Sequence, residues 1–194
     1  MAQSVRWTSA DLELLPDDGK RYEIIDGELY VSRPPHVYHQ LSCHNVGRVL
    51  DRWNANAPAG LVIPAPGLIF AEDDDVAPDV VWISSPGLAA AVAPDGKLHA
   101  APELVVEVLS PGVTNERRDR EAKLKLYSRH GVREYWIVNW QRQELEVYRR
   151  RELSLQLVAT LLADDFLQSP LLPDFSCPVR DLFAGIPISR VVTE

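Results

Sequence analysis

The sequence predicts an α/β fold of the mixed α+β kind, in which helices flank a mixed β-sheet. Residues 104–109 form an almost unbroken apolar run, which is typical of a strand covered on both faces. A helical pattern follows over about residues 114–130, and an earlier one covers about residues 36–54. Strand patterns lie on both sides of these helices, so we expect the helices to pack against one sheet.

Capping and turn signals predict the amino-terminal elements. Residues 8–15 have the pattern of a short capped helix that ends before Pro16. Residues 21–32 have alternating apolar side chains around an Asp-Gly pair, which is a strong hairpin signal. The apolar stripe of residues 36–54 then predicts an amphipathic helix.

The middle of the chain is predicted to be mostly strand. Residues 60–71 indicate one or two strands interrupted by prolines. The acidic residues 72–75 lack the ligand spacing of a calcium loop, so we expect a solvated turn. The next strand begins with Asp79, and an irregular or briefly helical crossover over residues 85–101 leads to the central strand.

Strand signals return after the long helix, for which Thr114 or Asn115 is the expected cap and Gly131 the expected end. The segments EYWIVNW and ELEVYRR predict a hairpin, and LSLQLVAT a further strand. The tail over residues 170–183 is expected to pack back as a loop and a short helix.

Length and composition predict a single domain over residues 1–194. The chain has 46% hydrophobic residues, no internal repeat and no convincing linker. Two cysteines support neither a disulfide framework nor a Cys-rich zinc site. We find no signal-peptide pattern and no apolar run long enough to span a membrane, so we expect a cytoplasmic protein that does not bind membranes.

The charge is unevenly distributed. A net charge of −8 argues against broad, non-specific affinity for nucleic acid. Residues 116–151, however, hold 11 Lys/Arg against 6 Asp/Glu. This segment could face phosphates, or it could be an ordinary solvated helix and hairpin.

Two carboxylates and a lysine form the candidate catalytic site. Glu107 interrupts the buried central strand, where an unpaired carboxylate is costly, and Asp79 opens a neighbouring strand. Together they could bind one hard cation, which polarises a phosphoryl group and activates water. Lys123, on the following helix, could orient that water or stabilise developing charge.

Four motifs follow one another along the chain: RYEIIDGEL, PDVVWIS, PELVVEVLSPG and RDREAKLKLYSRHGVREYWIVN. In this order they resemble the putative restriction endonuclease family of cyanobacteria and other bacteria, which belongs to the PD-(D/E)xK nuclease superfamily. The resemblance covers about residues 21–183. It implies a restriction-endonuclease-like sheet flanked by helices, with hydrolysis of phosphodiester bonds in DNA that depends on Mg²⁺ or Mn²⁺.

The resemblance also implies residue roles. Asp79 and Glu107 would bind the metal, with the carbonyl of Val108 as a further ligand. The family's usual lysine position, two residues after the glutamate, is Leu109 here. Lys123 would take over that role from the helix, with Lys125 as the fallback.

Four further residues are candidate auxiliaries. Asp119 lies four residues before Lys123, which predicts that the two share a helical face with Tyr127. Glu23 and Glu28 flank the hairpin turn, and one of them could help position metal or water. His39 could contact phosphate, although a surface or packing role is the simpler interpretation.

Aromatic residues are concentrated in the predicted strands. They could stack on bases, pack in the core or form a dimer face; from the last option we expect a homodimer. The residues are Trp82, Tyr135, Trp136, Trp140 and Tyr148.

Two hypotheses compete with the nuclease. The chain could be a catalytically inactive DNA-binding or regulatory module that retains the nuclease fold, as Leu109 and the acidic composition would suggest. Alternatively, Glu107 and Lys123 could form a buried ion pair in a structural protein.

Overall fold

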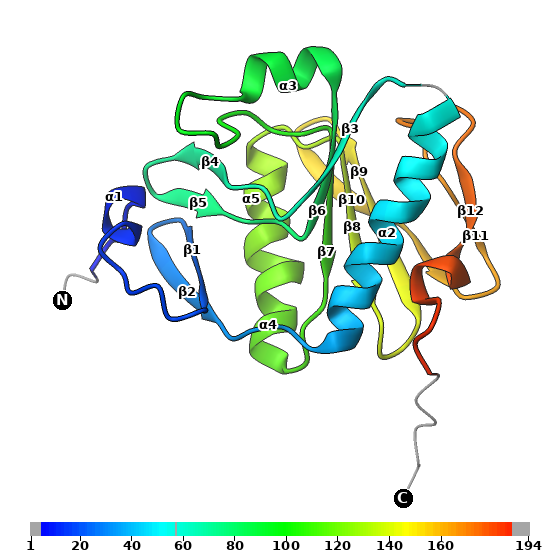
Figure 1. Ribbon diagram of the computed structural model, residues 1–194, viewed down its shortest axis with the longest axis horizontal. Helices are drawn as coiled ribbons and strands as arrows, with labels where there is room; N and C mark the ends of the chain where they lie inside the picture. The colour runs from blue at the N-terminus through cyan, green and yellow to red at the C-terminus, as the bar shows by residue number, and fades with distance from the viewer. Residues whose placement is uncertain (1–4, 57, 188–194) are drawn as a thin grey trace, which may run out of the picture.

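A six-stranded sheet forms the centre of the computed structural model, which describes residues 5–56 and 58–187 (Figure 1). Its strand order is β10-β9-β8-β7-β6-β3, and only β7 and β8 run parallel. The strands are β3 (Gly60–Pro64), β6 (Val80–Ser84), β7 (Leu104–Val108), β8 (Glu134–Asn139), β9 (Glu144–Arg151) and β10 (Ser154–Leu162). The predicted mixed sheet is therefore confirmed.

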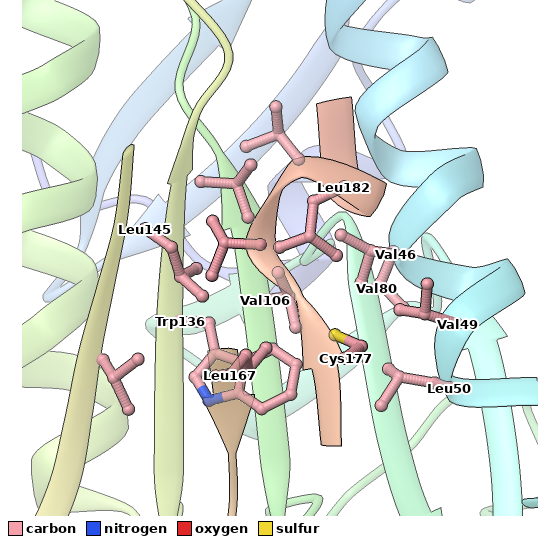
Figure 2. Close-up of a cluster of buried hydrophobic side chains, with 14 of the residues drawn as sticks. Val46, Val49, Leu50, Val80, Val106, Trp136, Leu145, Leu167, Cys177 and Leu182 are labelled. Atoms are coloured by element: carbon pink, nitrogen blue, oxygen red, sulfur yellow. The ribbon is translucent and has the colours of Figure 1, made fainter. Parts of the chain in front are cut away.

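Helices cover both faces of this sheet. On one face, α2 (Val37–Asn56) packs Val46 and Leu50 against Val106 of β7, in the core that Figure 2 shows. On the other face, Leu126 and neighbouring helical residues pack against the alternate side chains of β7. Every residue of β7 is buried, as its apolar run predicts, because alternate side chains enter the two cores.

The helical segment between β7 and β8 is continuous but not uniformly α-helical. It consists of α4 (Val113–Arg117), a π-helical turn η1 (Arg118–Lys123) and α5 (Leu124–Arg129). It ends just before Gly131, as predicted. Its expected start was wrong by two or three residues, since Gly112 with φ 111° is the N-cap in place of Thr114 or Asn115.

A smaller sheet of order β2-β1-β5-β4 lies beside the α4-η1-α5 segment (Figure 1). The predicted hairpin is β1 (Arg21–Ile25) and β2 (Glu28–Ser32). Asp26 and Gly27 both have positive φ, which a two-residue hairpin turn of this kind requires. β4 (Leu68–Ala71) and β5 (Asp74–Val76) complete the sheet.

The expected solvated turn over residues 72–75 was wrong in its second half. Asp74 and Asp75 belong to β5 and are buried. Arg129 lies 2.7 Å from Asp74, and Lys97 lies 3.3 Å from Asp75. These partners come from distant segments, so the acidic run alone could not reveal that it would be buried.

The remaining elements are short. The predicted amino-terminal helix is α1 (Ser9–Leu12), and the Thr8 N–H donates to the Asp11 carboxylate in a capping box. α3 (Ser85–Ala91) forms the brief helix of the crossover. The carboxyl-terminal part adds β11 (Phe166–Gln168), β12 (Ser176–Pro178) and the 3₁₀-helix η2 (Val179–Phe183), which close the core on the α2 face.

The aromatic residues of the strands are core residues. Trp136 and Tyr135 are fully buried, and the other three candidates are at most 9% exposed. They therefore form neither a stacking surface nor a dimer face, and the homodimer stays a prediction without this support. In the part of the chain that the structure describes, no helix has the length and apolar character needed to cross a bilayer.

Candidate active site

The two predicted metal-binding carboxylates lie at the ends of adjacent strands. β6 and β7 are antiparallel with Val80 opposite Val106, and one step further along this register brings Asp79 opposite Glu107. The Val108 N–H, just beyond the part of β7 that pairs with β6, donates to Asp79 Oδ2 at 2.9 Å. Asp79 and Glu107 line one pocket of about 240 Å³. The carboxylates predicted to act together therefore do lie together.

Lys123 reaches this site from the π-helical turn. Its side chain is fully buried, and its Nζ lies 2.8 Å from Glu107 Oε1 and 2.9 Å from Glu23 Oε1. Leu109, at the usual lysine position, is buried in the core between the sheet and the α4-η1-α5 segment. The structure therefore supplies an ammonium group beside Glu107 from a different element.

The helix presents three side chains to the sheet at the predicted spacing. Asp119, Lys123 and Tyr127 are all buried. The Tyr127 hydroxyl donates to Glu107 Oε1 at 2.7 Å, so this oxygen accepts from both Lys123 and Tyr127. π-Helical turns are frequent at functional sites. Lys125 is exposed and lies 3.6 Å from Asp26, so it does not replace Lys123.

The hairpin contributes Glu23 but not Glu28. Glu23 is buried, accepts from the Ala77 N–H at 3.0 Å and contacts Lys123. Glu28 lies at the turn end of the hairpin, is exposed and accepts from the Tyr30 hydroxyl. Only the first of the two predicted auxiliaries therefore belongs to the site.

Arg118 connects the helix to the hairpin. Its Nε donates to Asp119 Oδ1 at 3.0 Å, and its Nη1 lies 3.9 Å from Glu23 Oε2. Glu23 Oε2 and Asp119 Oδ2 are buried and have no hydrogen-bond partner among the described residues. Buried carboxylate oxygens without partners are costly, and they are common where a ligand or ion belongs.

His39 approaches Asp79 from the first turn of α2. The imidazole is buried, with Nε2 3.2 Å from Asp79 Oδ2 and Nδ1 3.5 Å from Cys43 Sγ. Of the two simpler roles expected for His39, surface or packing, its burial excludes the surface one. The other oxygen, Asp79 Oδ1, accepts from Arg21 at 3.1 Å. Sequence reasoning missed Arg21 and Cys43; Arg21 stood in the hairpin motif, whereas no pattern singled out Cys43.

Burial and neighbouring charges separate the pKa values of the two carboxylates. Burial, with help from the charge of Asp79, raises the pKa of Glu107 to about 8 although Lys123 opposes it. Burial also acts to raise the pKa of Asp79, but His39 and Arg21 outweigh it and hold that pKa below its ordinary value. For Lys123, burial acts to lower the pKa, and the charges of Glu107 and Glu23 raise it instead.

The donor set fits a hard divalent cation. Around the pocket we define a charged cluster with one more acidic than basic side chain: Asp79, Glu107, Glu23, Asp119, Arg21, Arg118 and Lys123. Such an excess favours uptake of a proton, which is what the raised pKa of Glu107 expresses, or of a cation. Carboxylate oxygens are the ligands that Mg²⁺ and Mn²⁺ prefer. The Val108 carbonyl stays a predicted ligand, since only the N–H of Val108 contacts the cluster.

Basic side chains also line the same pocket. Its lining includes four of them: Lys20, Arg21, Arg33 and Arg118. Of the basic segment 116–151, only Arg118 lines this pocket. Others in that segment form ion pairs, as Arg117 does with Glu121 and Arg120 with Glu146. The hairpin together with its two flanking residues, Lys20 and Arg33, therefore supplies more of the positive charge here than the long helix does.

Comparison with known proteins places this site in context. A family model described as Uma2, putative restriction endonuclease, matches residues 9–180. A crystal structure of a putative nuclease from Anabaena variabilis shares 17% identity and a TM-score of 0.71, over 91% of this chain and 97% of that one. The type IIG restriction endonuclease BpuSI is similar at 12% identity and a TM-score of 0.45, over 76% of this chain and 15% of that one. Among curated proteins, no match was found.

Proposed function

The chain belongs to the putative restriction endonuclease family, and from this membership and the charged cluster we propose that it hydrolyses phosphodiester bonds in DNA with Mg²⁺ or Mn²⁺. The observation that carries the proposal is the meeting of Asp79, Glu107 and Lys123. Two carboxylates line one pocket, and a buried ammonium group lies 2.8 Å from the second of them.

Asp79 and Glu107 would hold the cation. A bound divalent cation supplies Lewis-acid polarisation of the phosphoryl group and lowers the pKa of water. Arg21 and the Val108 N–H fix the Asp79 carboxylate, and Tyr127 fixes Glu107 Oε1. Each carboxylate is thus held in place before a ligand binds, which reduces the reorganisation needed during the reaction.

Lys123 is placed to act on the attacking water or on the charge that develops at phosphorus. Glu107 and Glu23 keep it protonated, since their charges raise its pKa. As an ammonium group it donates hydrogen bonds and does not act as a base. The role that we propose for Lys123 is therefore orientation and electrostatic stabilisation.

The basic residues that line the pocket would bind the DNA backbone. Arg33 is exposed and, within the described part of the chain, forms no ion pair, so its charge is available to a phosphate. Arg118 and Arg21 line the pocket and contact the carboxylates of Glu23 and Asp79, respectively. Such contacts position a backbone without reading its sequence.

The ion pair between Lys123 and Glu107 also fits the structural hypothesis, in which the pair only stabilises the fold. In the hypothesis of an inactive DNA-binding module, the basic residues that line the pocket would bind DNA, but the protein would not cleave it. One observation argues against both of these alternatives. The pocket is lined by Asp79, whose pKa is lowered, and by Glu107, whose pKa is raised, as expected where a cation replaces a proton.

A cleavage assay on supercoiled plasmid and on short duplexes tests the proposal. We expect nicked or linear product with Mg²⁺ or Mn²⁺ and none with a chelator. Glu107→Gln should abolish cleavage, whereas the exposed Glu28→Gln should retain it. DNA binding without cleavage under all metal conditions would replace the proposal with the inactive module. If the folded protein binds neither DNA nor metal, the structural hypothesis remains.

A further inference from the structure

A second set of metal-binding atoms lies beside the charged cluster. His39 and Cys43 are four residues apart on α2, so their side chains lie on one face of the helix. Both face Asp79, and one ligand atom from each of the three residues lies within 4.8 Å of the others. An imidazole, a thiol and a carboxylate form a donor set unlike the all-oxygen pair of Asp79 and Glu107.

We propose that His39, Cys43 and Asp79 form a site for a thiophilic divalent cation, with Zn²⁺ as the best-fitting ion. Zn²⁺ takes nitrogen, sulfur and oxygen ligands in tetrahedral geometry, and three protein ligands leave one position for water. Mg²⁺ does not favour thiolate, so the two neighbouring sites differ in the ions that they select.

The geometry requires only a small adjustment. Ligand atoms of a tetrahedral zinc site lie about 3.3–3.8 Å apart, given zinc bonds of about 2.0–2.3 Å. An imidazole binds one zinc ion through one ring nitrogen. His39 Nε2 lies 3.2 Å from Asp79 Oδ2, whereas the 3.5 Å contact of Cys43 Sγ is with the other nitrogen, Nδ1. Taken with one ligand atom from each residue, the three atoms lie within 4.8 Å of one another. Rotation of the Cys43 and His39 side chains could close the widest separation by about 1 Å.

Two pockets give access to these atoms. His39 and Asp79 line the pocket that contains Glu107, and Cys43 lines a second pocket of about 490 Å³ between α2 and β3. Binding would form a sulfur–metal bond and release the Cys43 thiol proton to solvent. Both cysteines are free thiols, and Cys177 lies in the core on the α2 face, which makes it a natural control.

Sharing of Asp79 has a regulatory consequence, and this part rests on the proposed function. When Asp79 binds Zn²⁺, its carboxylate donates electron density to that ion. The ion itself adds positive charge beside Glu107. Binding of Mg²⁺ or Mn²⁺ at Asp79 and Glu107 should therefore weaken. Zinc would act as an inhibitor that competes with the catalytic cation.

Cobalt spectroscopy tests the site without any activity assay. Wild-type protein titrated with Co²⁺ alone should develop a thiolate-to-cobalt charge-transfer band, and Zn²⁺ should abolish the band by displacing Co²⁺. Cys177→Ser should keep the band, and Cys43→Ser should lose it. Cys43→Ala serves as a second variant, and circular dichroism checks the fold of each. Absence of the band in the folded wild type, or its persistence in the folded Cys43 variants, would overturn the site.

Calorimetry with Mn²⁺ tests the sharing of Asp79. Saturating Zn²⁺ should weaken Mn²⁺ binding by about tenfold or more in wild type and in Cys177→Ser, but not in Cys43→Ser. Unchanged Mn²⁺ binding in zinc-loaded wild type would refute the sharing. A cobalt band in a protein that never cleaves DNA would contradict the proposed function and leave the zinc site standing, so the two failures can be told apart.

Discussion

Lys123 Nζ lies 2.8 Å from Glu107 Oε1, and both side chains are almost completely buried. Lys123 belongs to the π-helical turn and Glu107 to the central strand β7, against which the α4-η1-α5 segment packs. Burial removes most of the solvation that would compensate either charge of such an ammonium–carboxylate pair. The pair can persist because Tyr127 adds a hydrogen bond to Glu107 and Glu23 adds a second contact to Lys123.

Replacement of Lys123 should separate its catalytic role from its structural one. Lys123→Met leaves two buried carboxylates without their shared cation, so we expect a loss of about 3–5 kcal/mol in the free energy of unfolding. Cleavage per folded molecule should fall by about 10²–10³-fold, while Mn²⁺ binding persists. Lys125→Met, an exposed change on the same helix, should alter neither quantity. Unaltered cleavage by the folded Lys123 variant would assign the lysine to structure alone.

Removal of the Glu107 charge should eliminate the catalytic metal site. In Glu107→Gln the amide keeps the shape of the side chain but no longer offers a carboxylate, so saturable Mn²⁺ binding should disappear in calorimetry. Glu28→Gln removes one acidic charge from the exposed end of the hairpin and should leave binding intact. If the folded Glu107 variant still binds Mn²⁺ with wild-type affinity, Glu107 is not a ligand.

Metal affinity should increase with pH. The folded-state pKa of Glu107 is raised to about 8, so below that pH the carboxyl holds a proton that the cation must displace. We expect Mn²⁺ affinity to rise by up to about tenfold per pH unit below pH 8 and to level off above it. Calorimetry at several pH values, in buffers of different ionisation enthalpy, measures both the affinity and the released proton. A flat profile without proton release would contradict the assignment.

Tyr127 should tune that pH profile. Its hydroxyl donates to Glu107 Oε1 at 2.7 Å, and a donor to the ionised form lowers the pKa of a carboxyl. Tyr127→Phe should therefore raise the pKa of Glu107 further and shift Mn²⁺ binding to higher pH. The matched change Tyr135→Phe removes a buried hydroxyl that donates to the Asp119 carbonyl at 3.0 Å, and it should shift the profile less. Equal shifts would point to a general effect of burial.

Two glycine substitutions test the packing of β3 on the main sheet. A Cβ on Gly60 would lie 2.2 Å from the Ile83 carbonyl oxygen of β6, so Gly60→Ala must displace the edge strand. We expect a loss of about 1–3 kcal/mol in the free energy of unfolding by chemical denaturation. Gly47 lies within α2 with nothing within 4 Å of an added Cβ. Gly47→Ala should therefore stabilise the protein by up to about 1 kcal/mol, and equal effects of the two changes would contradict the packing of β3.

The sequence alone determined the elements whose signals are local. The apolar run of β7 predicted burial on both faces, and the Asp-Gly pair predicted the hairpin turn, because side-chain periodicity and backbone preference act over a few residues. Asp79 and Glu107 could be chosen because a carboxylate in or beside a buried strand requires a partner. The start of the long helix was misplaced because Gly112, not a polar side chain, is its N-cap.

Only the tertiary structure decided the partners of those carboxylates. Glu23 and Lys123 lie 100 positions apart in the chain, and Arg21 and Asp79 lie 58 apart, so no local pattern links them. The hairpin register and the docking of the π-helical turn determine that Glu23 enters the site and Glu28 does not. Electrostatic and hydrogen-bond interactions depend on distance in space, and packing of the two sheets and α2 sets those distances.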